Sequence, residues 1–219
     1  MEYFITGIDT DIGKTYITKG LSLAFEKCGK KTGVYKPLQS GAVKTNNGLK
    51  APDLEAVKEL SSTIRTKYSY LLEGEVSPAL AARLAGVNIS IEKIKSDFES
   101  FKKRNDITFV EGAGGILAPA ADSILCADLI KNLNIPVIIV TVPFLGRLNH
   151  ILLTIYYAKA NNINIKGIVV NKVPQKTDDL AVLNFVDELK MYTDVKILGE
   201  IHDTPQLKLD EFVSLTNKL

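Results

Sequence analysis

The residues whose types and spacing point most directly to chemistry are Gly13, Lys14 and Thr15. Backbone N–H groups at the start of a helix, together with the positive end of the helix dipole, attract an anion. A lysine in such a turn adds positive charge for terminal phosphates, and a threonine hydroxyl is a hard oxygen ligand suited to Mg²⁺. The triplet therefore predicts a loop that binds the phosphates of a nucleotide together with Mg²⁺.

The flanking sequence supplies the elements that such a loop needs. Residues 3–6 are aromatic and β-branched, which predicts a buried strand, and residues 16–28 carry apolar side chains at helical spacing. The usual phosphate-loop pattern has glycine at position 8, whereas this chain has Ile8 there and places Gly7 one residue earlier. The alternative is an ordinary start of a helix. The position between the first strand and the first helix favours the phosphate loop.

The rest of the chain alternates between apolar, β-branched stretches and helical patterns. Strands are expected at residues 32–35, 107–110, 137–142, 166–170 and 195–198, and helices at 54–60, 77–85, 90–104, 146–160, 180–191 and 207–219. This alternation predicts an α/β fold with a doubly wound, mostly parallel sheet in three α/β/α layers. At 219 residues, the chain is expected to form a single phosphate-loop NTPase-like domain, 1–219.

Polar residues end several of these strands. Lys36, Glu111 and Asn171 each follow an apolar stretch, and Lys14 follows the first strand. In open α/β sheets, ligands bind at the carboxyl ends of the strands, so we expect these residues to converge although they are far apart in the sequence. The polar stretch from Leu38 to Pro52 follows one strand end and is expected to be a ligand-facing loop.

Two acidic residues are candidate Mg²⁺ ligands. Glu111 ends an apolar strand and precedes Gly112-Ala113-Gly114-Gly115, small residues that leave room for the backbone to approach a ligand. The alternative for Glu111 is a carboxylate that caps a neighbouring helix. Asp53 follows Pro52 and is either a second metal ligand or the N-cap of the helix that follows it. The sequence favours the metal for Glu111 and does not separate the two roles for Asp53.

Lys36 and two hydroxyl residues are candidates for contacts with reacting groups. Lys36 stands directly before Pro37, which predicts that its ammonium lies near the phosphate loop. Such a lysine stabilises the negative charge that develops on a transferring phosphoryl group, although a solvated lysine would have the same spacing. Thr10 and Ser40 lie in the two loops that flank this space, and each is either a substrate contact or a turn former.

Composition narrows the functional classes. Lys and Arg number 27 against 25 Asp and Glu, a balance that gives no reason to expect nucleic acid or an anionic membrane as a partner. Only two cysteines are present, Cys28 and Cys126, which suits a reducing compartment better than a disulfide framework. Residues 1–3 lack the cationic start of a signal peptide, and the longest apolar run is too short to span a bilayer. We therefore expect a cytoplasmic protein.

Taken together, these stretches resemble the dethiobiotin synthetases, ATP-dependent ligases of biotin biosynthesis. The resemblance rests on Gly7 to Thr15, Tyr35 to Pro37 with Ser40-Gly41, Asp53, Ser77-Pro78, Glu111 to Gly115 with Pro119, Leu145-Gly146 with Asn149-His150, and Gly199 to Ile201. These segments span nearly the whole chain in the family's order. The early Gly7 and the non-glycine residue at position 8 are features that the family shows.

The resemblance implies a homodimer that acts on 7,8-diaminopelargonic acid, CO₂ or bicarbonate, and ATP. One amine becomes a carbamate, the carbamate attacks the γ-phosphate to give a carbamic-phosphoric anhydride, and the second amine closes the ureido ring. Lys14 and Lys36 are implied to be catalytic, stabilising phosphoryl and carbamate charge. Mg²⁺ is implied to bind to Thr15, Asp53 and Glu111.

The resemblance also implies the contacts of the two organic substrates. Thr10 and Ser40 would contact the diamine end of the substrate, and Gly146 and Asn149 at a helix start would receive its carboxylate across the dimer interface. The nucleotide would be bound through Asp11, Ile12, Gly13, Lys14, Thr15, Tyr16, Glu111, Gly112, Ala113, Gly114, Asn171 and Lys172. Residues 201–205 depart from the family's usual base-binding segment. Strict selection of ATP over other nucleoside triphosphates therefore stays open.

Two other classes share parts of this pattern. A switch ATPase of the partitioning or cell-division type carries a signature lysine directly after the first position of the motif, where this chain has Asp9. An amidoligase such as cobyrinic acid a,c-diamide synthase needs a glutaminase domain with a nucleophilic cysteine, and 219 residues leave no room for it. The ligase hypothesis is therefore preferred to both.

Overall fold

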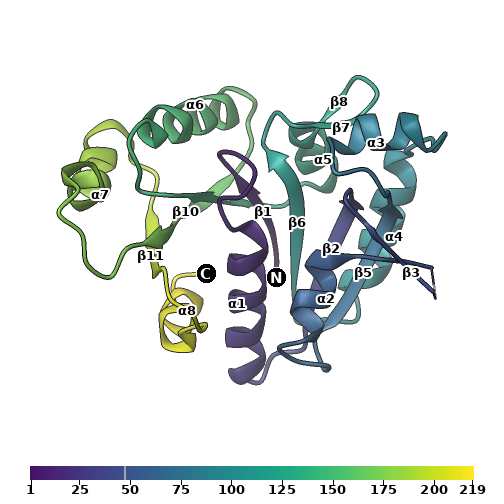
Figure 1. The fold of residues 1–219 in the computed structure, drawn as a ribbon, viewed down its shortest axis with the longest axis horizontal. Helices are drawn as coiled ribbons and strands as arrows, with labels where there is room; N and C mark the ends of the chain where they lie inside the picture. Colours follow the sequence, from purple (N-terminus) through teal and green to yellow (C-terminus); the bar gives the residue numbers. More distant parts are fainter. Residues whose placement is uncertain (47) are drawn as a thin grey trace.

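The computed structural model describes residues 1–46 and 48–219, which form one central sheet covered by helices on both faces (Figure 1). The seven strands of this sheet lie in the order β11-β10-β9-β1-β6-β2-β5, and every neighbouring pair is parallel. They are β1 (Glu2–Gly7), β2 (Thr32–Gln39), β5 (Arg65–Leu71), β6 (Ile107–Gly115), β9 (Val137–Thr141), β10 (Ile165–Val173) and β11 (Ile197–His202). The prediction of a doubly wound parallel α/β fold is therefore confirmed.

The helices form the two outer layers. They are α1 (Lys14–Lys27), α2 (Pro52–Lys58), α3 (Pro78–Leu84), α4 (Ile91–Lys102), α5 (Cys126–Leu133), α6 (Arg147–Ala160), α7 (Leu180–Tyr192) and α8 (Leu209–Thr216). Helices α1 and α8 share an apolar core with one face of β1, β6, β9, β10 and β11. Helices α4, α5, α6 and α7 share a second core with the opposite face. Strands buried on both faces explain their continuous apolar sequence.

Several elements differ from the sequence-based expectation. Strand β5 was not predicted, because it lies at the edge of the sheet and mixes Arg and Lys with Tyr, a composition typical of protected edges. The expected loop from Leu38 to Pro52 was wrong in part. Its first two residues extend β2, and it contains a small antiparallel hairpin, β3 (Val43–Thr45) with β4 (Gly48–Lys50). A second hairpin, β7 (Pro119–Ala121) with β8 (Ile124–Leu125), precedes α5 and was also not predicted.

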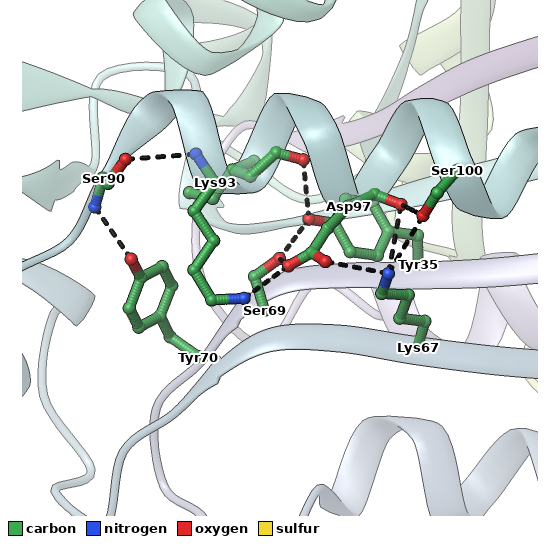
Figure 2. A network of polar contacts seen from close by, with 9 residues as sticks. Tyr35, Lys67, Ser69, Tyr70, Ser90, Lys93, Asp97 and Ser100 are labelled. Atoms are coloured by element: carbon green, nitrogen blue, oxygen red, sulfur yellow. Dashed lines mark hydrogen bonds and ion pairs between the residues drawn. The ribbon is translucent and has the colours of Figure 1, made fainter.

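A polar network fixes α4 against β2 and β5 (Figure 2). The Asp97 carboxylate on α4 accepts a hydrogen bond from Ser69 Oγ at 2.6 Å and pairs with Lys67 at 2.9 Å and Lys93 at 2.6 Å. Ser69 in turn lies 2.5 Å from the hydroxyl of Tyr35, which also donates to the carbonyl of Ile94 at 3.1 Å. Burial raises the pKa of Tyr35, so this phenol stays protonated. The network anchors β2 at the residue that precedes Lys36.

Within the described residues, no helix is long and apolar enough to cross a membrane. Both cysteines are free: Cys28 is exposed at the end of α1, and Cys126 is buried at the start of α5. The thiol of Cys126 donates to the carbonyl of Ala113 at 3.1 Å. The start of α5 therefore contacts the glycine-rich end of β6 through this hydrogen bond.

Candidate active site

The phosphate loop connects the end of β1 to the start of α1, at the carboxyl edge of the sheet (Figure 1). Two residues adopt left-handed backbone conformations, Asp11 at φ 55° and Gly13 at φ 88°. A Cβ at Gly13 would lie 2.1 Å from Nδ2 of Asn171, so only glycine fits. Asn171 donates to the carbonyl of Ile12 at 2.8 Å, and Lys172 donates to that of Asp11 at 2.7 Å. The end of β10 therefore holds the loop in shape.

Lys14 opens α1 and is almost fully buried beneath this loop. Its ammonium donates to the carbonyl of Asp9 at 2.7 Å. Burial, reinforced by the neighbouring ammonium of Lys36, lowers the pKa of Lys14 to about 8. A cation that is destabilised in this way binds an anion favourably, because the anion restores the charge balance that burial removes.

A cluster of charged residues faces the phosphate loop. The ammonium of Lys36, on β2, lies 2.7 Å from Oδ2 of Asp53 and 2.8 Å from Oε1 of Glu111. The hydroxyl of Thr15 lies 2.9 Å from Oδ1 of Asp53 and 2.8 Å from Oε1 of Glu111. Asp53 lies in the first turn of α2, Thr15 in the first turn of α1, and Glu111 in β6. The predicted convergence of residues from distant parts of the sequence is thus present.

The charges of this cluster stabilise one another. Burial acts to lower the pKa of Lys36, but the carboxylates of Glu111 and Asp53 outweigh it, and the pKa of Lys36 is raised above its ordinary value. Burial likewise acts to raise the pKa of Asp53, but Lys36 and hydrogen bonds from Thr15 and Gln39 outweigh it, and the pKa of Asp53 is lowered. Lys36 and Asp53 are therefore both charged near neutral pH.

The alternative role of Asp53 as a helix cap is wrong. The N-cap position of α2 is Ala51, without a side-chain cap, and the helix begins at Pro52, two residues before its expected start. Because Asp53 lies inside the first turn, its carboxylate is directed to Lys36 and Thr15 instead. Glu111 does not cap a helix through any described hydrogen bond either. Its described partners are the side chains of Thr15 and Lys36.

The cluster has the donor set of a Mg²⁺ site. Oε2 of Glu111 is buried and has no hydrogen-bond partner among the described residues. Together with the Asp53 carboxylate and the Thr15 hydroxyl, it supplies the hard oxygen ligands that Mg²⁺ prefers. Two carboxylates and one hydroxyl are too few to enclose the ion. They suit a metal that keeps several waters and binds phosphate oxygens of a nucleotide. The residues therefore fit Mg²⁺.

A cleft of about 900 Å³ opens over the phosphate loop and the charged cluster. Of the predicted site residues, it is lined by Thr10, Asp11, Gly13, Lys14, Thr15, Lys36, Ser40, Asp53, Glu111, Gly112, Ala113, Gly114 and Lys172. Its volume is near the upper end of the range of small-molecule pockets. Thr10 and Ser40 therefore share one cavity with both lysines.

Other predicted residues lie outside this cleft. The side chain of Ile12 is buried in the apolar core, and Tyr16 packs against Phe212 with ring centroids 5.8 Å apart. Asn171 is buried and supports the phosphate loop rather than lining the cleft. Gly146 and Asn149 are exposed at the start of α6 and do not line the cleft of their own chain.

The structure adds residues to which the sequence analysis gave no role. The cleft is also lined by Gln39, by Glu75 and Val76 ahead of α3, and by Ala118. Arg147 of α6 forms an ion pair with Asp9 of the phosphate loop at 3.1 Å. This pair joins residues 138 positions apart, so no local sequence signal identifies it.

The fold and the site define the class of protein. A glycine turn after the first strand, with a lysine and a threonine at the start of the next helix, is the phosphate loop of nucleoside triphosphatases. A family model described as an AAA domain matches residues 1–210. The septum site-determining protein MinD of Pyrococcus horikoshii has the same fold, with a TM-score of 0.64, 16% identity, and coverage of 100% of this chain and 96% of that one. A plasmid partition protein of Borrelia burgdorferi gives a TM-score of 0.66 at 13% identity, with coverage of 99% and 96%.

Sequence similarity identifies the family more narrowly. The chain is 36% identical over 216 residues to the ATP-dependent dethiobiotin synthetase BioD of Clostridium perfringens, covering 95% of this chain and 94% of that protein. It is 33% identical to the BioD protein of Thermodesulfovibrio yellowstonii, with coverage of 95% and 91%, and 36% identical to that of Anoxybacillus flavithermus, with coverage of 91% and 90%. The chain belongs to the dethiobiotin synthetase family.

Proposed function

We propose that the protein is a dethiobiotin synthase, which uses ATP and CO₂ to convert 7,8-diaminopelargonic acid into dethiobiotin, ADP and phosphate. The observation that carries this proposal is one cleft in which Lys14 and Lys36 lie beside Asp53 and Glu111, with the hydroxyls of Thr10 and Ser40 on its walls. A phosphoryl-transfer ligase needs cations, metal ligands and room for a second substrate in one place. Membership of the dethiobiotin synthetase family supports the same activity.

The reaction proceeds in three steps. One amine of the substrate attacks CO₂, forms a C–N bond and loses a proton to give a carbamate. A carbamate oxygen then attacks the γ-phosphorus, and the bond from this phosphorus to the bridging oxygen of ADP breaks. The second amine finally attacks the carbonyl carbon of the mixed anhydride, loses a proton, and displaces phosphate to close the ring.

The chain's own residues act on the charges of these steps. The backbone N–H groups at the start of α1 and the ammonium of Lys14 bind the β- and γ-phosphates. Lys36 stabilises the negative charge that forms between the carbamate and the γ-phosphate. Thr15, Asp53 and Glu111 would hold Mg²⁺, which neutralises phosphate charge when bound. Thr10 and Ser40 orient the diamine end. We assign nucleotide contacts to the cleft residues Asp11, Gly13, Gly112, Ala113, Gly114 and Lys172, and also to Ile12, Tyr16 and Asn171, which adjoin the phosphate loop outside the cleft.

We propose that the working enzyme is a cytoplasmic homodimer of single-domain subunits, with the carboxylate of the substrate bound at the interface. The exposed face of α6 and the residues before it supports this assembly. Leu145 is 87% exposed, Leu153 59% and Tyr156 75%, so three large apolar side chains on or beside α6 are left open to contact with a second subunit. Gly146 and Asn149 adjoin this face, where they would serve the cleft of a second subunit. Light scattering of Tyr156→Glu would give the mass of a monomer if this face forms the dimer.

The activity is tested by following the product. The protein is incubated with MgATP, ¹³C-labelled bicarbonate and 7,8-diaminopelargonic acid, and dethiobiotin is identified by mass spectrometry. The expected product carries one labelled carbon in the ureido carbonyl. Absence of this product, together with slow ATP hydrolysis that does not respond to the diamine, would refute the proposal and favour a switch ATPase.

A further inference from the structure

The cleft contains a buried amide oxygen that no described residue satisfies. Gln39 is the last residue of β2, is only 5% exposed, and lines the cleft. Its Oε1 is buried and has no hydrogen-bond partner among the described residues. A buried acceptor left without a donor costs free energy, so such an atom commonly marks the place of a ligand or an ordered water.

Hydrogen bonds of the backbone and of the side-chain nitrogen hold this oxygen in place. The backbone of Gln39 is fixed in the sheet, where it pairs with Leu71 and its carbonyl accepts from the N–H of Leu72 at 2.8 Å. On the side chain, Nε2 donates to the carbonyl of Ser40 at 2.8 Å, and the amide lies close enough to Asp53 to help lower the pKa of that carboxyl. Because the bond to Ser40 uses the N–H₂ end, Oε1 is left without a partner among the described residues.

The chemistry of the two substrates decides what an acceptor can contact here. The triphosphate of ATP presents only oxygen acceptors, and so it cannot donate to Oε1. The ammonium groups of Lys14 and Lys36 are already directed to Asp9 and to the two carboxylates. The N–H donors that remain are the amino group of adenine, which lies at the far end of ATP from the γ-phosphate, and the two amines of the diamine. Gln39 directly precedes Ser40, which we have placed at the diamine end.

We propose that Gln39 is a specificity-determining residue, whose Oε1 accepts a hydrogen bond from one amine of the diamine substrate. This inference rests on the proposed function. An acceptor on one N–H turns the lone pair of that nitrogen to a fixed direction, so Gln39 both selects an amine at this position and orients it. A hydroxyl-only site at Thr10 and Ser40 would not distinguish the amines in this way.

The test compares Gln39→Met with the wild-type enzyme. Methionine keeps the length of the side chain and removes the strong acceptor. We expect the KM for the diamine to rise about tenfold. The KM for MgATP and the half-saturating Mg²⁺ concentration should change by less than about twofold, because Asp53 keeps its contacts with Lys36 and Thr15. Gln175→Met, the same change at an exposed site, should leave all three constants unchanged.

A second readout uses substrates that lack one amine. Nonanoic acids with a single amine at carbon 7 or at carbon 8 are tested as competitive inhibitors. In the wild-type enzyme, the amine that Gln39 contacts should give the tighter inhibitor, and Gln39→Met should remove this difference. Gln39→Asn moves the acceptor back by one methylene group and should also raise the KM for the diamine. This variant replaces Gln39→Met in the test if the methionine variant does not fold.

The outcomes separate this inference from the proposed function. An unchanged KM for the diamine in Gln39→Met and Gln39→Asn would overturn the role of Gln39. A parallel rise in the constants for diamine, MgATP and Mg²⁺ would also overturn it, because this result would show that Gln39 only positions Asp53. A wild-type protein that forms no dethiobiotin refutes the proposed function itself.

Discussion

Replacing Lys36 with methionine tests the charged cluster most thoroughly. In the unliganded protein, one ammonium compensates two carboxylates, those of Asp53 and Glu111, at 2.7 and 2.8 Å. Lys36→Met keeps the length of the side chain and leaves these carboxylates facing each other without a cation. The variant should therefore be less stable without Mg²⁺, and Mg²⁺ should restore more stability to it than to the wild type.

The size of this effect follows from burial. Removing one partner of a buried ion pair costs about 3–5 kcal/mol. Glu111 is fully buried, whereas the side chain of Asp53 is 25% exposed and is partly solvated, so we expect the lower end, about 3 kcal/mol. For a chain of this length, this corresponds to a fall in Tm of roughly 6–12 °C. Loss of the ammonium from the transferring phosphoryl group should also lower kcat about 10²- to 10³-fold.

The pH range of the effect follows from the signs of the two shifts. The raised pKa of Lys36 contributes stability that is fully present below its ordinary value of 10.5 and is lost as the pH rises through the folded-state pKa. The lowered pKa of Asp53 contributes stability that is present above its ordinary value of 3.8 and is lost as the pH falls through the folded-state pKa. The stability contributed by these two shifts in the wild-type protein should therefore be constant between about pH 4 and pH 10.

Thermal melts of three proteins, with EDTA and with millimolar Mg²⁺, provide the measurement. The matched control is Lys58→Met, which removes the exposed ion pair of Lys58 with Glu55 in α2 and should change stability by less than about 1 kcal/mol. If Lys36→Met is as stable as Lys58→Met, or if Mg²⁺ gives it no extra protection, the electrostatic account of the cluster is refuted.

Three further predictions concern single features of the structure. Gly13→Ala should weaken MgADP binding more than tenfold in calorimetry, because its Cβ would lie 2.1 Å from Asn171. The control Gly29→Ala, with a similar φ and no atom within 4 Å of its Cβ, should bind MgADP normally. Equal affinities of the two variants would contradict this explanation. Lys14, with a pKa of about 8, should take up a proton when MgADP binds at pH 9 but not at pH 6.5, so the affinity for MgADP should fall as the pH rises above 8. Calorimetry in buffers of different ionisation enthalpy measures this proton uptake. No uptake at pH 9 would show that Lys14 is already fully charged before MgADP binds. Asp97→Asn should lower the free energy of unfolding, measured with urea at pH 7, by about 1–2 kcal/mol, because Lys67, Lys93 and Ser69 hold the pKa of Asp97 at about 2 against the effect of burial. The difference from the wild type should shrink as the pH falls from 3.8 towards 2. A difference that stays constant would argue against the charge of Asp97 as its cause.

The sequence was sufficient for the part of the site that local patterns encode. Lys14 and Thr15 follow a buried strand and open a helix, and Lys36 and Glu111 follow the apolar stretches of β2 and β6, so a parallel sheet brings them to one edge. Glycine-rich turns and continuous β-branched runs are strong local signals. They predicted both the sheet and the phosphate loop.

Other features depend on tertiary contacts that the sequence does not display. Asp53 after Pro52 has the pattern of a helix cap and of a metal ligand alike, and the cap is excluded only by the fold, in which α2 begins at Pro52. Strand β5 is protected by charge at the sheet edge and so lacks an apolar run. The unsatisfied oxygen of Gln39 is visible only when every neighbouring donor has been placed. Pairs such as Arg147 with Asp9 are equally invisible until the fold is known.

The central claim is that the cleft couples ATP cleavage to ring closure on a diamine. The most direct test measures phosphate release from MgATP and dethiobiotin formation in the same reaction, as 7,8-diaminopelargonic acid is titrated. The account predicts phosphate release that depends on the diamine, with one phosphate for each dethiobiotin. Phosphate release that is unaffected by the diamine, or that exceeds the product severalfold at saturation, would contradict it.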